Sequence, residues 1–439
     1  MTATMSPAAP PAPTATEKSP RRGLIQSVRR LGWGVLDQGI SSLSNFALGL
    51  FVARSFGASN FGAFTLAYIT YTFVINAARG LSTDPLLVRY SGDRGRRWHR
   101  ATSAATGTAL LIGVAAGVIC IAVGLLLPDP LGPVFVALGV GLPGLVVQDS
   151  FRFAFFAIGR GSAAFFNDLF WTVLLVSALF LLHSSGDGSA ARCLLVFGGT
   201  AAVAALLGGI QARVLPRPNR IEWWVRTHRQ ISVRYLIENL TISSAGQVRS
   251  YVLGAVAGLA AVGYVRASEI LMGPFLVILM GLSQVAVPEA SRVFHRNSGR
   301  LARFCFVLGG SQAATAIVWG LLLITIFPLG PGPALLKELW VPTSQLIPAI
   351  TLTVAAASFT TAATAGLRAM GVARRSLRAQ LTGSTAYAIG GAGGAVVAGA
   401  LGASWGVTIA QIFAALVWWH QLRSALAAHH AVAVAEVAR

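Results

Sequence analysis

The chain has 439 residues, of which 55% are hydrophobic and 11% are charged, and its mean hydropathy is +0.68. A soluble domain usually carries about a quarter charged residues, so this composition excludes an ordinary soluble protein and favours one that crosses a membrane several times. The formal net charge of +20 is also typical of nucleic-acid-binding proteins, and its meaning depends on where the basic residues lie.

The chain opens with a Pro/Ala/Thr-rich and then basic segment, 1–30, which predicts a disordered tail. Apolar stretches of about 20 residues follow, long enough to cross a membrane as helices. We predict twelve helices, at 33–53, 61–85, 101–127, 132–158, 162–182, 192–212, 233–256, 262–288, 302–328, 344–367, 377–399 and 402–424. The three cysteines lie isolated in these stretches, so neither a disulfide framework, a metal site nor a cofactor is expected.

Basic residues alternate between the connections that join these helices. Every second connection carries arginine, with four or more basic residues in all but the one at Arg160, whereas the others hold only Arg54, Arg192 and Lys337. Because basic residues stay on the cytoplasmic side of a membrane, both termini are predicted to lie in the cytoplasm. The protein itself is predicted to lie in the cytoplasmic membrane. The charge is then a sign of topology, and no nucleic-acid partner is expected. The basic segment 216–232 contains Trp223 and Trp224, which suits either an interfacial segment or an ordinary basic loop.

The two halves of the chain show weak sequence similarity to each other. A shift of 201 positions brings Asp37 onto Glu238 and Gly57 onto Gly258. With six helices on each side of segment 216–232, this predicts an all-α membrane protein with two six-helix lobes, 31–215 and 233–426, around a central cleft, followed by a tail, 427–439.

Polar and charged residues recur inside the predicted spans, where a charge is costly unless it faces protein or water. Three arginines, Arg79, Arg249 and Arg266, suit a phosphate group because their guanidinium groups offer paired donors. Three acids, Asp37, Glu238 and Glu269, suit ion coupling or pairing with these arginines. Asp149 and Arg152 are expected to pair with each other, and Asp168 is expected near the cytoplasmic interface.

A stripe of neutral polar side chains completes the predicted cavity. These residues suit hydrogen bonds to a sugar, although such side chains also join helices in membranes. They are Asn45, Tyr68, Thr72, Asn76, Asn239, Ser243 and Gln247.

Three stretches carry a resemblance to a known superfamily. "VARSFGASNFGAFTLAY", "VGYVRASEILMGPFLVILMGLSQVAVPEASR" and "GLRAMGVARRSLRAQL" resemble helix connections of the multidrug/oligosaccharidyl-lipid/polysaccharide (MOP) exporter superfamily. The lipid II flippases of that superfamily usually have two further helices, so the chain looks closer to the Wzx-like polysaccharide and O-antigen flippases.

The resemblance implies a flippase that moves polyprenyl-pyrophosphate-linked glycan precursors across the membrane by alternating access. Its expected partners are the lipid-linked glycan, membrane lipid and other polysaccharide-assembly proteins, and the chain is expected to act as a monomer. A multidrug exporter and a membrane glycosyltransferase or polymerase are the alternatives. No nucleophile–base set or Gly-rich phosphate loop is seen in the sequence, so we expect a transporter rather than an enzyme.

Overall fold

The computed structural model describes residues 20–437 apart from residues 94 and 187, and every regular element in this part is a helix. The predicted all-α class is therefore confirmed. The helices are α1 (Pro20–Ser55), α2 (Gly57–Ala78), α3 (Asp84–Tyr90), α4 (Arg96–Leu126), α5 (Leu131–Ala157), α6 (Gly161–Ser184), α7 (Ala190–Ala212), α8 (Ile221–Ala257), α9 (Leu259–Leu271), α10 (Gly273–Arg296), α11 (Leu301–Thr325), α12 (Pro331–Leu336), α13 (Trp340–Ser344), α14 (Ile347–Ala369) and α15 (Ala373–Val437).

Several connections are short helical turns of other kinds. A π-helical segment, η1 (Arg79–Thr83), joins α2 to α3, and the 3₁₀ turns are η2 (Pro218–Arg220), η3 (Ser298–Arg300), η4 (Phe327–Leu329) and η5 (Lys337–Leu339). The long helix α15 is kinked at Ala398 and Gly399, where the backbone leaves helical geometry. The kink falls at the end of the predicted span 377–399, just before the last predicted span.

Among the described residues, nine helical segments are long and apolar enough to cross a membrane. The last of these, 374–431, contains two of the predicted spans. Neither α8, which is rich in charged residues, nor the α9–α10 pair, which is broken at Met272, is among the nine. The protein is thus a helical membrane protein, and twelve remains the predicted number of crossings.

The structure differs from the predicted organisation at its connecting segments. Residues 20–30 of the predicted disordered tail form the first turns of α1, because Leu24, Val28 and Leu31 continue the apolar helical spacing of the span that follows. Helix α8 already begins inside the predicted linker 216–232, and α15 runs through most of the predicted carboxy-terminal tail.

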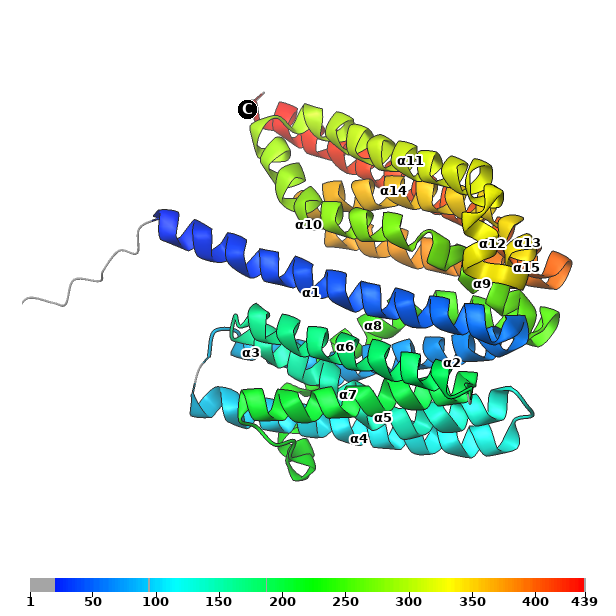
Figure 1. Cartoon of the computed structure of the whole chain (residues 1–439). Coiled ribbons are helices and arrows are strands. Elements are labelled where there is room, and N and C mark those ends of the chain that lie inside the picture. The colour runs from blue at the N-terminus through cyan, green and yellow to red at the C-terminus, as the bar shows by residue number, and fades with distance from the viewer. Residues whose placement is uncertain (1–19, 94, 187, 438–439) are drawn as a thin grey trace, which may run out of the picture.

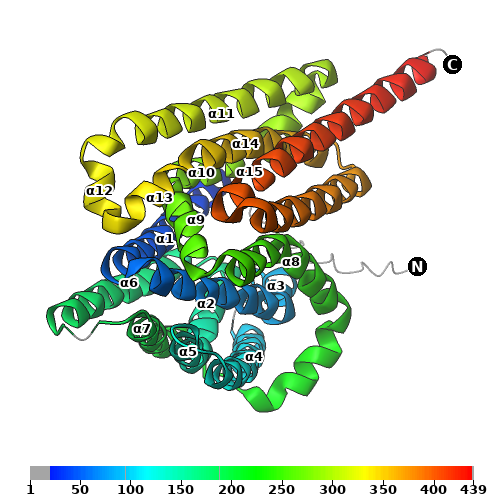
Figure 2. The same ribbon diagram turned by 90° about the vertical axis from the view of Figure 1, so that its right-hand side faces the viewer.

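The helices form two groups that lie side by side (Figures 1 and 2). We call α1–α7 the amino-terminal lobe and α8–α15 the carboxy-terminal lobe. Helix α8 packs against both, since it contacts η1 and α2 in one lobe and α15 in the other. We call the end of the molecule with Arg54, Arg192 and Lys337 the arginine-poor end, and the opposite end the arginine-rich end.

The apolar core is shared at one end and divided at the other. At the arginine-poor end one cluster of buried residues joins both lobes, with Phe61 and Phe64 of α2 together with Val262 and Leu271 of α9. Towards the arginine-rich end the core splits into a cluster in the amino-terminal lobe and a separate one in the carboxy-terminal lobe. Helix α8 also packs on the amino-terminal lobe there, with Trp224 in that lobe's cluster. Apart from α8, the two lobes share a buried apolar cluster of described residues at the arginine-poor end alone.

Close contact between backbones at this end depends on glycine. A Cβ atom added at Gly62 would lie 1.8 Å from the carbonyl oxygen of Leu259, and one added at Gly263 would lie 2.6 Å from that of Ala58. Since neither contact can be relieved by turning a side chain, α2 and α9 must separate if a side chain is introduced.

We expect Gly62→Ala to loosen the arginine-poor end and to raise the amide hydrogen exchange of residues 258–264. The control is Gly199→Ala, because a Cβ atom at Gly199 meets no atom within 4 Å. Equal exchange in the two variants would contradict the assignment of this contact as one that holds the lobes together at the arginine-poor end.

Candidate functional site

A break in the first part of the carboxy-terminal lobe positions one group of charged residues. Helix α9 ends at Leu271, and α10 starts at Gly273 with Pro274 in its first turn. The carbonyl oxygen of Leu271 accepts a hydrogen bond from the indole nitrogen of Trp319 at 3.0 Å. Interrupted helices of this kind line binding sites in membrane transporters, and Arg266 and Glu269 lie in the last turns before this break.

Glu269 joins two of the predicted phosphate-binding arginines. Its Oε1 accepts from Nη2 of Arg249 at 2.6 Å, and its Oε2 accepts from Nη1 of Arg266 at 3.2 Å. The three side chains carry a net charge of +1, so one positive charge is left over for an anion. In addition, the Nε atom of Arg249 is buried and makes no hydrogen bond within the described part of the chain.

Small and aromatic residues of α15 fix the position of Arg249. The guanidinium carbon lies 5.6 Å from the centre of the Tyr387 ring, close enough for a cation–π contact. A Cβ atom at Gly391 would lie 2.7 Å from Cγ of Arg249, so glycine at this position makes room for the arginine stem. Arg249 therefore lies against Tyr387, which lines a cavity, although Arg249 is not itself among the lining residues.

That cavity has a volume of about 320 Å³ and lies between α8, α14 and α15. Hydroxyl, amide and aromatic side chains dominate its wall. Two pairs are already hydrogen-bonded: Gln380 donates to Ser384 at 3.1 Å, and Gln411 donates to Thr360 at 3.2 Å. The lining residues are Ser243, Ala245, Gly246, Thr360, Gln380, Gly383, Ser384, Tyr387, Gln411, Ala414 and Trp418.

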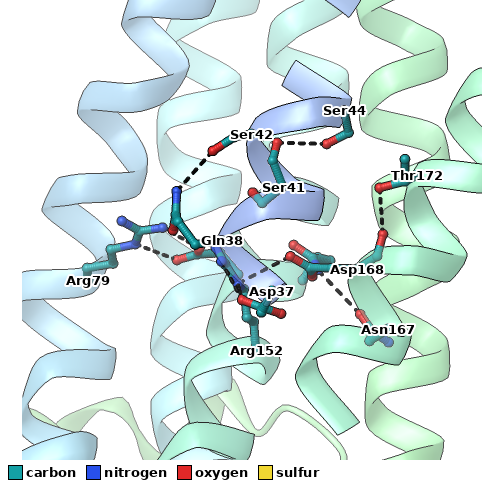
Figure 3. A network of polar contacts seen from close by, with 12 residues as sticks. Asp37, Gln38, Ser41, Ser42, Ser44, Arg79, Arg152, Asn167, Asp168 and Thr172 are labelled. Atoms are coloured by element: carbon teal, nitrogen blue, oxygen red, sulfur yellow. Dashed lines mark hydrogen bonds and ion pairs between the residues drawn. The ribbon is translucent and has the colours of Figure 1, made fainter. Parts of the chain in front are cut away.

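A second charged group lies in the amino-terminal lobe, around Arg152 (Figure 3). Arg152 donates to Oδ2 of Asp37 from Nε at 2.7 Å, and its Nη2 lies 2.5 Å from the same oxygen. Asp168 lies 3.2 Å from Nε of Arg152 and accepts from Gln148 at 2.8 Å. Asp37 is 0% exposed and Asp168 is 1% exposed, so this acid is buried beside Arg152 and is not solvated. Its position near the cytoplasmic interface stays a prediction.

The remaining predicted arginine, Arg79, binds an acid of α5. Its Nε and Nη2 donate to the two carboxylate oxygens of Asp149 at 2.9 and 2.6 Å. The predicted Asp149–Arg152 pair is therefore wrong. The formal charges of these two arginines and three aspartates sum to −1, whereas the formal charges of the carboxy-terminal group sum to +1.

The π-helical segment η1 begins at Arg79 and interrupts the predicted polar face of its helix. Such segments leave a carbonyl group without its usual helical partner and recur at functional sites. Here the carbonyl oxygen of Leu81 accepts from the indole nitrogen of Trp224 at 3.0 Å and from the hydroxyl of Ser232 at 3.4 Å. Trp224 is fully buried, so the interfacial alternative predicted for this tryptophan is wrong.

Replacement of Trp224 by phenylalanine is expected to destabilise this contact by about 1 kcal/mol, the typical net value of one hydrogen bond. Hydrogen exchange of residues 79–84 should rise as a result. Trp223→Phe is the matched control, because the ring of Trp223 packs on Arg100 and does not bond to Leu81. Faster exchange in both variants would point to a loss of packing rather than of the hydrogen bond.

The predicted polar stripe is used in part to join helices. Asn76 donates to Ser243 at 2.7 Å, and Asn239 donates to Asp84 at 2.8 Å and to the carbonyl of Asn76 at 3.2 Å. These bonds link α2 to α8 and, through Asp84, to α3. The Tyr68 ring lies 5.4 Å from the guanidinium carbon of Arg266, so this residue connects α2 to the charged group of α9.

The other predicted residues have simpler surroundings. Thr72 donates to the carbonyl of Ile69 in its own helix at 2.7 Å, while Asn45 and Gln247 are half-buried. Glu238 is exposed, unlike Asp37, with which it aligns in the sequence. The described residues contain no group of three His, Cys, Asp or Glu side chains arranged to hold a metal ion.

Sequence reasoning missed several residues of the cavity, including Gln380, Tyr387, Gln411 and Trp418. A signal for them existed, since Gln380, Ser384 and Tyr387 recur at helical spacing within one apolar stretch. Without a view of the opposite helices, that face could not be distinguished from ordinary helix contacts.

Comparison with solved structures shows which known folds this chain resembles. The chain aligns with an inward-facing multidrug resistance MATE family transporter of the MOP superfamily at a TM-score of 0.68 and 14% identity, over 90% of this chain and 98% of that one. An outward-facing structure of such a transporter gives a TM-score of 0.58 at 14% identity, over 94% and 97% of the two chains.

A lipid II flippase, MurJ, in an inward closed conformation aligns at a TM-score of 0.62 and 13% identity, over 91% of this chain and 87% of that one. No protein-family model matches the sequence, and no curated protein matches it. At these identities the likeness concerns the fold. The chain therefore has the fold of the MOP-superfamily transporters.

Proposed function

We propose that this protein is a flippase that carries polyprenyl-pyrophosphate-linked oligosaccharide or polysaccharide precursors across the cytoplasmic membrane. The observation that carries the proposal is the cavity of hydroxyl, amide and aromatic side chains beside Arg249. Amides and hydroxyls offer hydrogen bonds to a sugar, and the ring of Trp418 offers a flat apolar face. The unshared positive charge of the Arg249–Glu269–Arg266 group suits the pyrophosphate.

The division of the core supports transport by alternating access. The lobes share a core at the arginine-poor end and have separate cores at the other, which is the arrangement of a transporter closed on one side. The higher TM-score to the inward-facing relative agrees with this state. By the positive-inside rule the arginine-rich end faces the cytoplasm, where lipid-linked glycans would enter.

The opposite net charges of the two groups suggest that they bind different ligands. In the carboxy-terminal lobe the excess positive charge would bind the anionic part of the cargo. In the amino-terminal lobe the excess negative charge around Asp37 would bind a proton or another cation that drives the cycle. Under this proposal Arg79 pairs with Asp149. Arg79 then has a structural role and not the predicted role of a phosphate ligand.

The test uses inverted membrane vesicles, which expose the arginine-rich end. A labelled polyprenyl-pyrophosphate oligosaccharide is added with an external glycosidase, with and without an ion gradient. Protein-dependent protection of the glycan that falls in Arg266→Ala would support the proposal. Absence of protection with vesicles that contain correctly folded protein would count against it.

A multidrug exporter is the second candidate. It is favoured by the alignment with a multidrug resistance MATE family transporter and by the excess acid in the amino-terminal lobe, which would attract organic cations. Gradient-driven expulsion of ethidium from the same vesicles, lost in Asp37→Asn, would support this alternative. The solved relatives are transporters, which favours either candidate over a membrane glycosyltransferase.

A further inference from the structure

A second cavity lies at the arginine-poor end, away from both charged groups described above. It has a volume of about 610 Å³, within the range of roughly 300–1,000 Å³ that is usual for ligand pockets, and it opens between the ends of α1 and α6 and the turn η5. Its lining residues are Phe51, Arg54, Ser55, Phe56, His183, Gly186, Gly188 and Lys337.

The charge of this cavity is unusual for its position. Basic residues are rare at the arginine-poor end of the molecule, where the connections hold only three arginines or lysines. Two of those three, Arg54 and Lys337, line this cavity together with His183. No acid is among its described lining residues, and no ion pair of Arg54 or Lys337 is seen in the described part of the chain. Basic side chains that line one cavity, with no acid among its described lining residues, favour an anion.

The cavity is formed by both lobes. Arg54 and His183 belong to the amino-terminal lobe, and Lys337 belongs to the carboxy-terminal lobe, whose segments α12 and η5 contact α1. Rings of α1 and α6 brace the wall, with the centres of Phe51 and His183 5.9 Å apart. Lys337 has a φ angle of 48°, in the left-handed region that favours glycine, so the turn holds a charged residue where glycine would be less strained.

We propose that this cavity binds a phosphate or diphosphate ester at the arginine-poor face. Arg54 would provide paired donors, and Lys337 would provide a point charge from the opposite lobe. Because such a ligand contacts both lobes, it would favour the state in which this end is closed. The two sources of this chemistry are the headgroup of a membrane phospholipid and the diphosphate of a lipid-linked cargo. The site requires only the cavity, so it does not depend on the proposed function.

The first measurement is calorimetric titration of inorganic pyrophosphate into the purified full chain in phosphatidylcholine nanodiscs. We expect binding that Arg54→Gln and Lys337→Gln each weaken about tenfold or more, the effect of losing one charge-assisted contact. Arg303→Gln is the matched control. Arg303 is exposed and lies near the opposite end, and its replacement removes the same single positive charge. Thermal unfolding of all variants checks that each is folded.

Pyrophosphate could also bind at Arg249 and Arg266, so Arg266→Gln is titrated in parallel. Weakening in Arg266→Gln with no change in Lys337→Gln would overturn the proposal, as would absent binding or equal binding in all variants. Retained binding in Arg266→Gln would support it even if glycan protection fails, which separates this site from the proposed function.

A second set of nanodiscs distinguishes the two sources. If phosphatidylglycerol occupies the cavity, its addition should weaken pyrophosphate binding in the unmodified protein and have no such effect in Lys337→Gln. If pyrophosphate binding is insensitive to phosphatidylglycerol, the site is assigned to the diphosphate of a cargo. The proposal is supported in both cases, and the ligand is identified by which case holds.

Discussion

Replacement of Arg152 by methionine is expected to destabilise the amino-terminal lobe by about 3–5 kcal/mol, the usual cost of removing one partner from a buried ion pair. The side chain lies within 3.2 Å of both Asp37 and Asp168. Without it, two buried carboxylates would face each other with no cation between them. The free energy of unfolding, measured by SDS titration in mixed micelles, should fall accordingly.

The control for this prediction is Arg226→Met. Arg226 pairs with Glu222 at 2.6 Å, and both side chains are largely exposed, so its loss should cost less than about 1 kcal/mol. Addition of Asp37→Asn to Arg152→Met should restore part of the lost stability, because it removes one of the two orphaned charges. If Arg152→Met and Arg226→Met lower the free energy of unfolding by the same small amount, water reaches the side chains around Asp37. The assignment of a buried ion network would then be wrong.

The helices themselves could be predicted because their signal is local. Each of the twelve predicted ranges falls on helical segments of the structure, since a run of apolar residues in a membrane has few alternatives to a helix. The ends were less predictable. The start of α8 depends on Trp224, which is buried against Tyr90 of α3, far away in the sequence. Nothing in its immediate neighbourhood in the sequence reveals that contact.

The charged residues could be recognised from the sequence, but their partners could not. A charge within an apolar stretch is visible as such, whereas the choice between Arg79 and Arg152 as partner of Asp149 depends on how α2 and α5 are rotated against each other. Internal symmetry was misleading here. Asp37 and Glu238 align in the sequence, yet one is buried in an ion network and the other is exposed, because the two lobes pack their first helices differently.

The same limit applies to the candidate cavity. Ser243 was predicted, but the residues opposite it come from α14 and α15, more than a hundred positions later. Spacing along one helix reveals which side chains share a face, and says nothing of which other helix that face meets. The carboxy-terminal cavity therefore became visible only in the structure, although each of its polar residues was present in an apolar stretch.

Arg249→Gln is expected to lower glycan protection in inverted vesicles by about ten- to a hundredfold. This corresponds to the roughly 1.5–3 kcal/mol of a hydrogen bond to a charged group. Two explanations would account for that loss. Arg249 could bind the pyrophosphate of the cargo, or it could serve only to neutralise Glu269, to which it is bonded at 2.6 Å.

The double variant Arg249→Gln with Glu269→Gln separates these explanations. It keeps the net charge of the group at +1 through Arg266, so no buried carboxylate is left without a cation. If Arg249 serves only Glu269, glycan protection should return in the double variant. We expect no return, because the buried Nε atom of Arg249 has no partner in the described structure and its guanidinium group lies against Tyr387, which lines the cavity. Arg249→Lys, which keeps the charge and loses the paired donors, should then recover only part of the activity.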